Sequence, residues 1–217
     1  MDIFLKENEH RDCFMPDGGG GCNVYLGRNS SLRFFTFNLG GKSLKNELNV
    51  VFKGKGARAE LYGLYLPQDG QVIENETLLR HQAPSCESFQ RYYGILPMGG
   101  KAVFNGKILI ERKAQKTKAY LESKNILLSP DAQMLGRPFL EIFADDVQCT
   151  HGFSSSQIEE DEIFYLRSRG HNLESAKRIL LLSFAQRNID KVADEETKNI
   201  LCERISRFLS EKLEAKN

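Results

Sequence analysis

The chain has 217 residues, of which 41% are hydrophobic and 27% charged, and its formal net charge is +1. This composition is typical of a soluble globular protein, and the near-neutral charge gives no reason to expect nucleic acid or a membrane surface as a partner. No apolar run is long enough to span a bilayer, and five scattered cysteines favour a reducing, cytoplasmic setting over a disulfide framework.

The first 151 residues or so show the alternation typical of β-strands. In Ser31–Leu39, for example, Leu32, Phe34 and Thr36 share one face. Further strand-like runs are predicted at 46–52, 57–66, 101–104, 107–112, 119–121, 125–128, 139–143 and 147–151. Glycine-rich breaks at 40–41, 54–56, 99–100 and 106 separate these runs.

Two all-β architectures fit this pattern equally well. An antiparallel sandwich needs hairpin signals, and only Asn105–Gly106 provides one. A parallel β-helix stacks short strands coil on coil, but the chain shows no strict repeat period. The strand pattern alone leaves both open.

Three helices are predicted after His151. Ser156 and Glu159 have the spacing of a capping box at the start of the first, and Gly170 ends it. Asn172 is placed to cap the second, whose apolar stripe is predicted to be Leu173, Ala176, Ile179, Leu180 and Phe184. The third begins near Asp194, with a stripe of Leu201, Ile205, Phe208 and Leu209, and ends in a solvated tail at 211–217. The predicted domains are a β core at 1–152 and a helical domain at 153–217.

The sequence contains only weak motifs for nucleotide binding or for catalysis on carbohydrates. The tetraglycine at 18–21 is followed by a strand-like run, and Gly41-Lys42-Ser43 lacks the earlier glycine of a phosphate loop, so we expect no nucleotide site. Asp145 and Asp146 could serve a β-helix carbohydrate-active enzyme as acids. However, neighbouring residues on a strand point to opposite faces, which favours a turn instead.

Cys149-Thr150-His151 is the sharpest local feature. On a strand, Cys149 and His151 point to the same side, and a thiolate with an imidazole forms half of a site for iron, zinc or an iron–sulfur cluster. From the residues alone a structural interpretation is favoured, with a buried cysteine and a hydrogen-bonded histidine in an interaction module, because free cysteine is among the most buried residue types. His81 is predicted to lie in a polar loop between strands.

Four segments resemble the SufD members of the SufB/SufD family, which belongs to the SUF machinery for iron–sulfur cluster assembly. They are HQAPSCES at 81–88, FNGKILIERKAQKT at 104–117, LEIFADDVQCTHG at 140–152 and IFYLRSRG at 163–170. The Cys-x-His pair within the third segment separates SufD from SufB. The family normally has more chain before the matching region, which implies a truncated product.

The resemblance implies a mainly β fold, with a right-handed parallel β-helix followed by a C-terminal α-helical domain. It implies a non-catalytic scaffold that pairs with SufB through the β-helix and with the ABC-type ATPase SufC through the helices. His151, and with weaker support Cys149, would be ligands of a transient iron–sulfur cluster shared with SufB. The isolated chain would carry no cluster and could form a homodimer.

Overall fold

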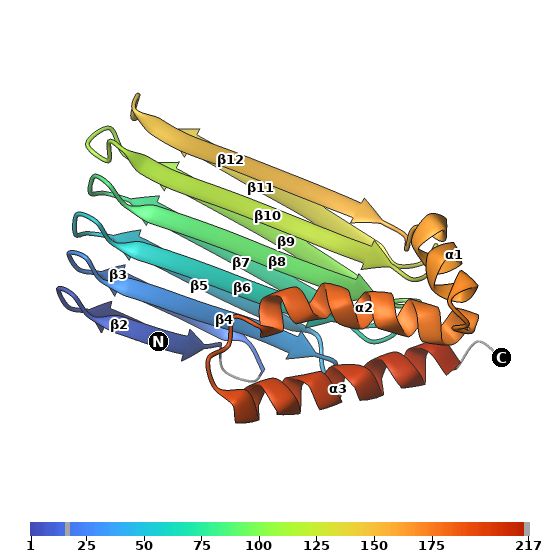
Figure 1. Cartoon of the computed structure of the whole chain (residues 1–217). Helices are drawn as coiled ribbons and strands as arrows, with labels where there is room; N and C mark the ends of the chain where they lie inside the picture. The colour runs from blue at the N-terminus through green and yellow to red at the C-terminus, as the bar shows by residue number, and fades with distance from the viewer. Residues whose placement is uncertain (16–17, 215–217) are drawn as a thin grey trace.

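The computed structural model describes residues 1–15 and 18–214, and its fold is a parallel β-helix followed by three helices (Figure 1). The first six strands are β1 (Asp2–Leu5), β2 (His10–Phe14), β3 (Gly20–Leu26), β4 (Ser31–Leu39), β5 (Leu44–Phe52) and β6 (Arg58–Leu66). The next six are β7 (Val72–His81), β8 (Glu87–Leu96), β9 (Lys101–Ile110), β10 (Thr117–Leu127), β11 (Gln133–Ile142) and β12 (Val147–Ser156). The predicted mainly β fold class is confirmed.

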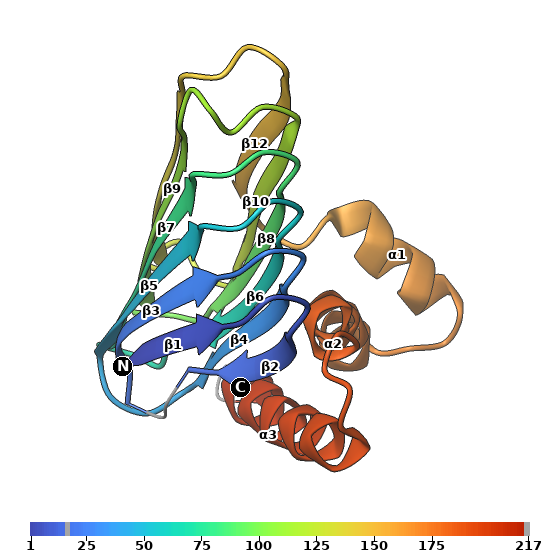
Figure 2. The same cartoon turned by 90° about the vertical axis from the view of Figure 1, so that its left-hand side faces the viewer.

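All of these strands pair in parallel into two sheets of six. One sheet has the order β1-β3-β5-β7-β9-β11 and the other β12-β10-β8-β6-β4-β2, so the chain alternates between two facing walls (Figure 2). Every second side chain points into the lumen between the walls, and the register stacks these side chains in columns. One column runs from Leu32 through Ala59, Ser88 and Ala119 to Cys149. The predicted shared face of Leu32, Phe34 and Thr36 is confirmed, since all three are buried, and it points into the lumen.

The strand predictions failed where the lumen contains glycine or polar residues. The sequence predicts a break at Gly106 and a hairpin signal at Asn105–Gly106, but both residues lie inside β9. A Cβ at Gly106 would lie 2.5 Å from Leu121 Cδ1, so close packing inside the lumen requires the glycine there, and no turn is present. The runs predicted at 119–121 and 125–128 likewise fall on one strand, β10, which ends at Leu127.

The turns between coils stack on one another through backbone hydrogen bonds. The Asn29 N–H donates to Lys55 O at 2.9 Å, and the Ser85 N–H donates to Gln115 O at 2.8 Å. Both donors have positive φ, as does Lys116, whose N–H donates to Asp146 O at 2.6 Å. This ladder satisfies turn amides that would otherwise lack partners, and it keeps the coils in register.

The helices are α1 (Glu160–Ser168), α2 (Leu173–Ile189) and α3 (Glu195–Glu214). The predicted capping box is wrong, because Ser156 is the last residue of β12 and Glu159 is an N-cap whose side chain makes no capping hydrogen bond. The predicted cap at Asn172 is confirmed, since its Oδ1 accepts from the Ser175 N–H at 2.8 Å. Of the predicted tail, residues 211–214 continue α3, and 215–217 lie outside the described residues.

Helices α2 and α3 cover the outer face of the β2–β12 sheet, and the opposite sheet has no described helix over it (Figures 1 and 2). The α3 stripe is confirmed, because all four of its predicted residues are buried. The α2 stripe is only partly correct, since Leu173 and Ile179 are exposed. The buried apolar residues of α2 are Ala176, Leu181, Ala185 and Ile189. The run Ile-Leu-Leu-Leu at 179–182 makes several faces of α2 apolar, so the sequence alone could not fix its orientation.

Asn188 ties α2 to the β-helix. This buried side chain donates from Nδ2 to Gly63 O of β6 at 2.6 Å, and Tyr93 stacks on Phe184 with ring centroids 4.6 Å apart. The helical and β parts therefore share a core. None of the helices in the described chain has the length and apolar character needed to cross a membrane.

Candidate functional site

The last coil of the β-helix, formed by β11 and β12, leaves one end of the lumen open. Among the described residues, β11 pairs only with β9 and β12 only with β10, so each has one unpaired edge. Five large apolar side chains are exposed on or beside this coil: Leu135, Phe139, Ile142, Phe143 and Phe153. Unpaired strand edges flanked by exposed apolar residues are typical of a surface that accepts another chain.

Cys149 and His151 lie on the lumen side of β12 in this coil. Their register partners on β10 are Ala119 and Leu121, both of which are buried in the core. Cys149 is half-buried against that core, whereas His151 is exposed. Strand alternation therefore predicted their shared face correctly. The exposure of His151 depends on its position in the last coil, where no further described coil covers it.

The pair can provide half of a metal site. Burial raises the pKa of the Cys149 thiol, which disfavours the thiolate form that binds metal, so His151 is the better ligand of the two. No group of three or more His, Cys, Asp or Glu side chains in the described residues is placed to hold a metal ion. A cluster bound here would need further ligands from another chain. If the pair had a purely structural role, both side chains would be expected to be buried. His151 is exposed, which does not fit that interpretation.

Asp145 and Asp146 lie in the exposed bend between β11 and β12. The backbone of Asp146 is held there by two bonds: its O accepts from the Lys116 N–H, and its N–H donates to Gln115 Oε1 at 2.9 Å. The predicted turn is confirmed. Asp146 belongs to the stacking of the turns and Asp145 is exposed beside it in the bend, which gives the carbohydrate-enzyme alternative no support.

His81 lies inside the protein, where a polar loop was predicted. It is the last residue of β7 and fully buried, its ring stacks on Phe52 with centroids 4.0 Å apart, and its Nε2 lies 3.0 Å from Ser88 Oγ. Burial lowers the pKa of His81 to about 3. Cys86 is also fully buried, and its Sγ–H donates to Gly54 O at 3.3 Å. Both residues stabilise the lumen and are not available as ligands.

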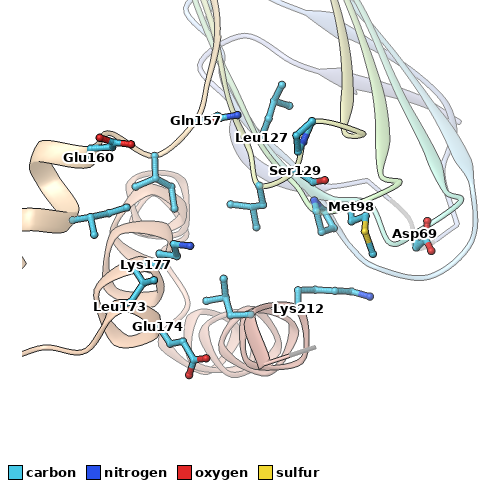
Figure 3. Close-up of a pocket in the computed structure, with 16 residues that line it drawn as sticks. Asp69, Met98, Leu127, Ser129, Gln157, Glu160, Leu173, Glu174, Lys177 and Lys212 are labelled. Atoms are coloured by element: carbon cyan, nitrogen blue, oxygen red, sulfur yellow. The ribbon is translucent and has the colours of Figure 1, made fainter. Parts of the chain in front are cut away.

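A second exposed feature is α1 together with the groove beside it. None of the α1 side chains is buried, and Phe164 and Tyr165 are 74% and 57% exposed. Figure 3 shows the groove between α1, α2, the end of α3 and the turns of the β-helix. It has a volume of about 700 Å³, and its lining includes Met98, Leu127, Ile163, Leu173, Lys177 and Lys212. The sequence did not single out Phe164 or Tyr165, because their pattern does not distinguish a packed helix from an uncovered one.

Comparison with known proteins shows what this arrangement is similar to. Residues 20–184 match the family model described as "SUF system FeS cluster assembly, SufBD core domain". The chain is 32% identical over 187 residues to "Iron-sulfur cluster assembly protein SufD" of Escherichia coli, covering 86% of this chain and 44% of that protein. It is 34% identical over 196 residues to a SufBD family protein of Mycobacterium leprae, covering 87% of this chain and 50% of that protein. The match to SufD of Plasmodium falciparum is also 34% identical, over 188 residues, covering 86% of this chain and 13% of that protein. The chain thus spans at most half the length of these relatives.

Proposed function

The chain belongs to the SufBD family of the SUF iron–sulfur cluster assembly system, and we propose that it acts as a SufD-like, non-catalytic scaffold subunit in that process. The observation that carries this proposal is the placement of His151 and Cys149 at the open end of the β-helix, beside two unpaired strand edges. Five free cysteines suit a reducing cytoplasm as its place of action.

We propose that SufB docks on this open end through its own β-helix. The unpaired backbone groups of β11 and β12 can extend a sheet into a partner, and the exposed phenylalanines nearby supply apolar contact area. In the absence of SufB, the same surface can pair with a second copy of this chain. The isolated chain holds no cluster in this scheme, because it supplies too few ligands.

The iron–sulfur cluster is the cargo of this complex. His151 would bind iron through a ring nitrogen, with SufB contributing cysteine thiolates, and Cys149 would be the weaker candidate on this chain. A cluster at a subunit junction can be released when the subunits move apart, which suits a scaffold that passes clusters on.

The ATPase SufC is proposed to dock on the helical domain. Phe164 and Tyr165 on α1 are exposed aromatic side chains, and aromatic residues are common anchors of protein interfaces. The groove beside α1 offers a partner an apolar recess with two lysines, Lys177 and Lys212, on its walls. In Figure 1 α1 follows the C-terminal end of β12, and in Figure 2 it projects to the side of the β-helix and does not lie over the open end, so SufB and SufC could bind together.

Co-purification tests the proposal as a whole. The chain, co-expressed with SufB and SufC, is expected to purify with both and to accept an iron–sulfur cluster on reconstitution, measured by visible absorbance and by iron and sulfide content. The chain purified alone is expected to contain no stoichiometric iron. Failure to retain SufB, or equal iron content with and without SufB, would contradict the shared site.

The α1 surface provides a separate prediction. Replacing Phe164 and Tyr165 together with alanine is expected to weaken SufC binding by about 30-fold, because exposed aromatic anchors contribute roughly 2 kcal/mol. The thermal stability of the chain should stay the same, since no α1 residue is buried. Binding is measured by calorimetry or surface plasmon resonance. The matched control is Ile200→Ala, which removes an apolar side chain that is 50% exposed on α3; an equal loss in the control would count against α1.

A further inference from the structure

We propose that Phe153 is a positioning residue that turns the His151 side chain towards Cys149. The inference rests on the proposed role of His151 and adds a residue that controls the geometry of the same site. It concerns the open end of the β-helix, where β12 has no further described coil above it.

Phe153 lies across the open lumen on the backbone of Gly136. His151 and Phe153 are two residues apart on β12, and their register partners Leu121 and Ser123 are both buried on the lumen side of β10. A Cβ added to Gly136 would lie 1.9 Å from Phe153 Cε2, so the ring occupies the space that a side chain on β11 would fill. Gly136 has no positive φ. The residue is therefore glycine because of the ring and not because of its backbone conformation.

This contact matters for His151 because the imidazole has few other neighbours to restrict it. In the inner coils a lumen side chain is held by the coils on both sides, whereas His151 has only Leu121 beneath it. Its neighbours on the same face of β12 are Cys149 and Phe153. Because the Phe153 ring lies across the lumen, it prevents the imidazole of His151 from turning towards the Phe153 side. The remaining orientations lean towards Cys149, which brings the two candidate ligands together.

An oriented imidazole binds metal more tightly, because less side-chain freedom is lost on binding. Phe153 itself is 37% exposed, so its removal should leave most of the core intact. Removing Phe153 should therefore weaken metal binding at His151 without unfolding the protein.

The test measures the orientation of His151 directly, in the full chain. Three-bond NMR couplings should show one dominant χ1 rotamer for His151 in the native chain and in Phe153→Tyr, which keeps the ring. Phe153→Ala should give averaged couplings. Co(II) serves as the metal probe, and its apparent Kd, read from absorption bands that His151→Ala abolishes, should rise about tenfold in Phe153→Ala.

A double-mutant comparison isolates the contact with Gly136. Gly136→Ala should displace the ring and reproduce both effects, yet it should add nothing in the Phe153→Ala background. Additive effects, unchanged couplings in Phe153→Ala, or a native chain without His151-dependent Co(II) bands would each overturn the inference. The proposed function fails separately, if the complex assembles clusters normally without His151.

Discussion

Replacing His151 with alanine is expected to abolish cluster formation on the reconstituted complex with SufB and SufC, lowering cluster content by about tenfold or more. The reason is geometric, since His151 is the exposed ligand-type side chain at the open end of the lumen, next to the edge proposed for SufB. Folding should be unchanged, because an exposed side chain contributes little to stability. SufC binding should also be unchanged, because His151 lies on β12 and not on α1, where SufC is proposed to bind. Visible absorbance, iron and sulfide content, thermal unfolding and SufC binding measure these outcomes.

The matched control is Thr150→Ala, because Thr150 lies on the same strand but on its outer face, where it is also exposed. This variant should assemble clusters normally. Cys149→Ser should have a smaller effect than His151→Ala, since burial raises the pKa of the thiol. Undiminished cluster assembly by His151→Ala would remove His151 from the site, and equal losses in all three variants would point to a folding defect instead.

The β-helix was only partly accessible from the sequence, for a physical reason. Strands with apolar lumen residues, such as β4 with Leu32 and Phe34, alternate clearly and were predicted. Strands β7 and β8 were missed, because their lumen residues include Asn75, Thr77 and Gln90. Two of these polar side chains form a hydrogen bond within the lumen: Thr77 Oγ1 donates to Gln90 Oε1 at 2.7 Å. Alternation of apolar and polar residues cannot reveal a wall whose inner face is itself polar.

The candidate site, too, could be predicted only in part from the sequence. The common face of Cys149 and His151 follows from strand alternation and was predicted. The exposure of His151 was not, because it depends on β12 being the last strand of its sheet in the described chain. The role proposed for Phe153 depends on its contact with Gly136, which joins opposite walls of the lumen. No pattern within either strand reveals which residues face each other across that space.

His81 belongs to the buried polar residues of β7, and we expect it to cause a loss of stability in mild acid. The pKa of His81 falls from 6.5 to about 3 on folding, because the buried site disfavours the charged ring. Between these values the unfolded chain binds a proton that the folded chain does not, so the free energy of unfolding decreases as the pH falls. The slope approaches about 1.4 kcal/mol per pH unit, which gives a loss of about 2 kcal/mol between pH 7 and pH 5.

Denaturant unfolding at pH 7, 6 and 5 measures this slope. The range stays above pH 4.5, the ordinary pKa of the glutamates whose pKa is lowered on folding, such as Glu60 and Glu122, so their contribution is small there. His81→Phe should flatten the slope whatever its stability at pH 7, because a phenylalanine does not titrate and can stack on Phe52 in the same column. His171→Phe, at an exposed position, is the matched control and should retain the slope. A slope that persists in His81→Phe would show that another group takes up the proton on unfolding, and that the buried ring is not what limits this fold in acid.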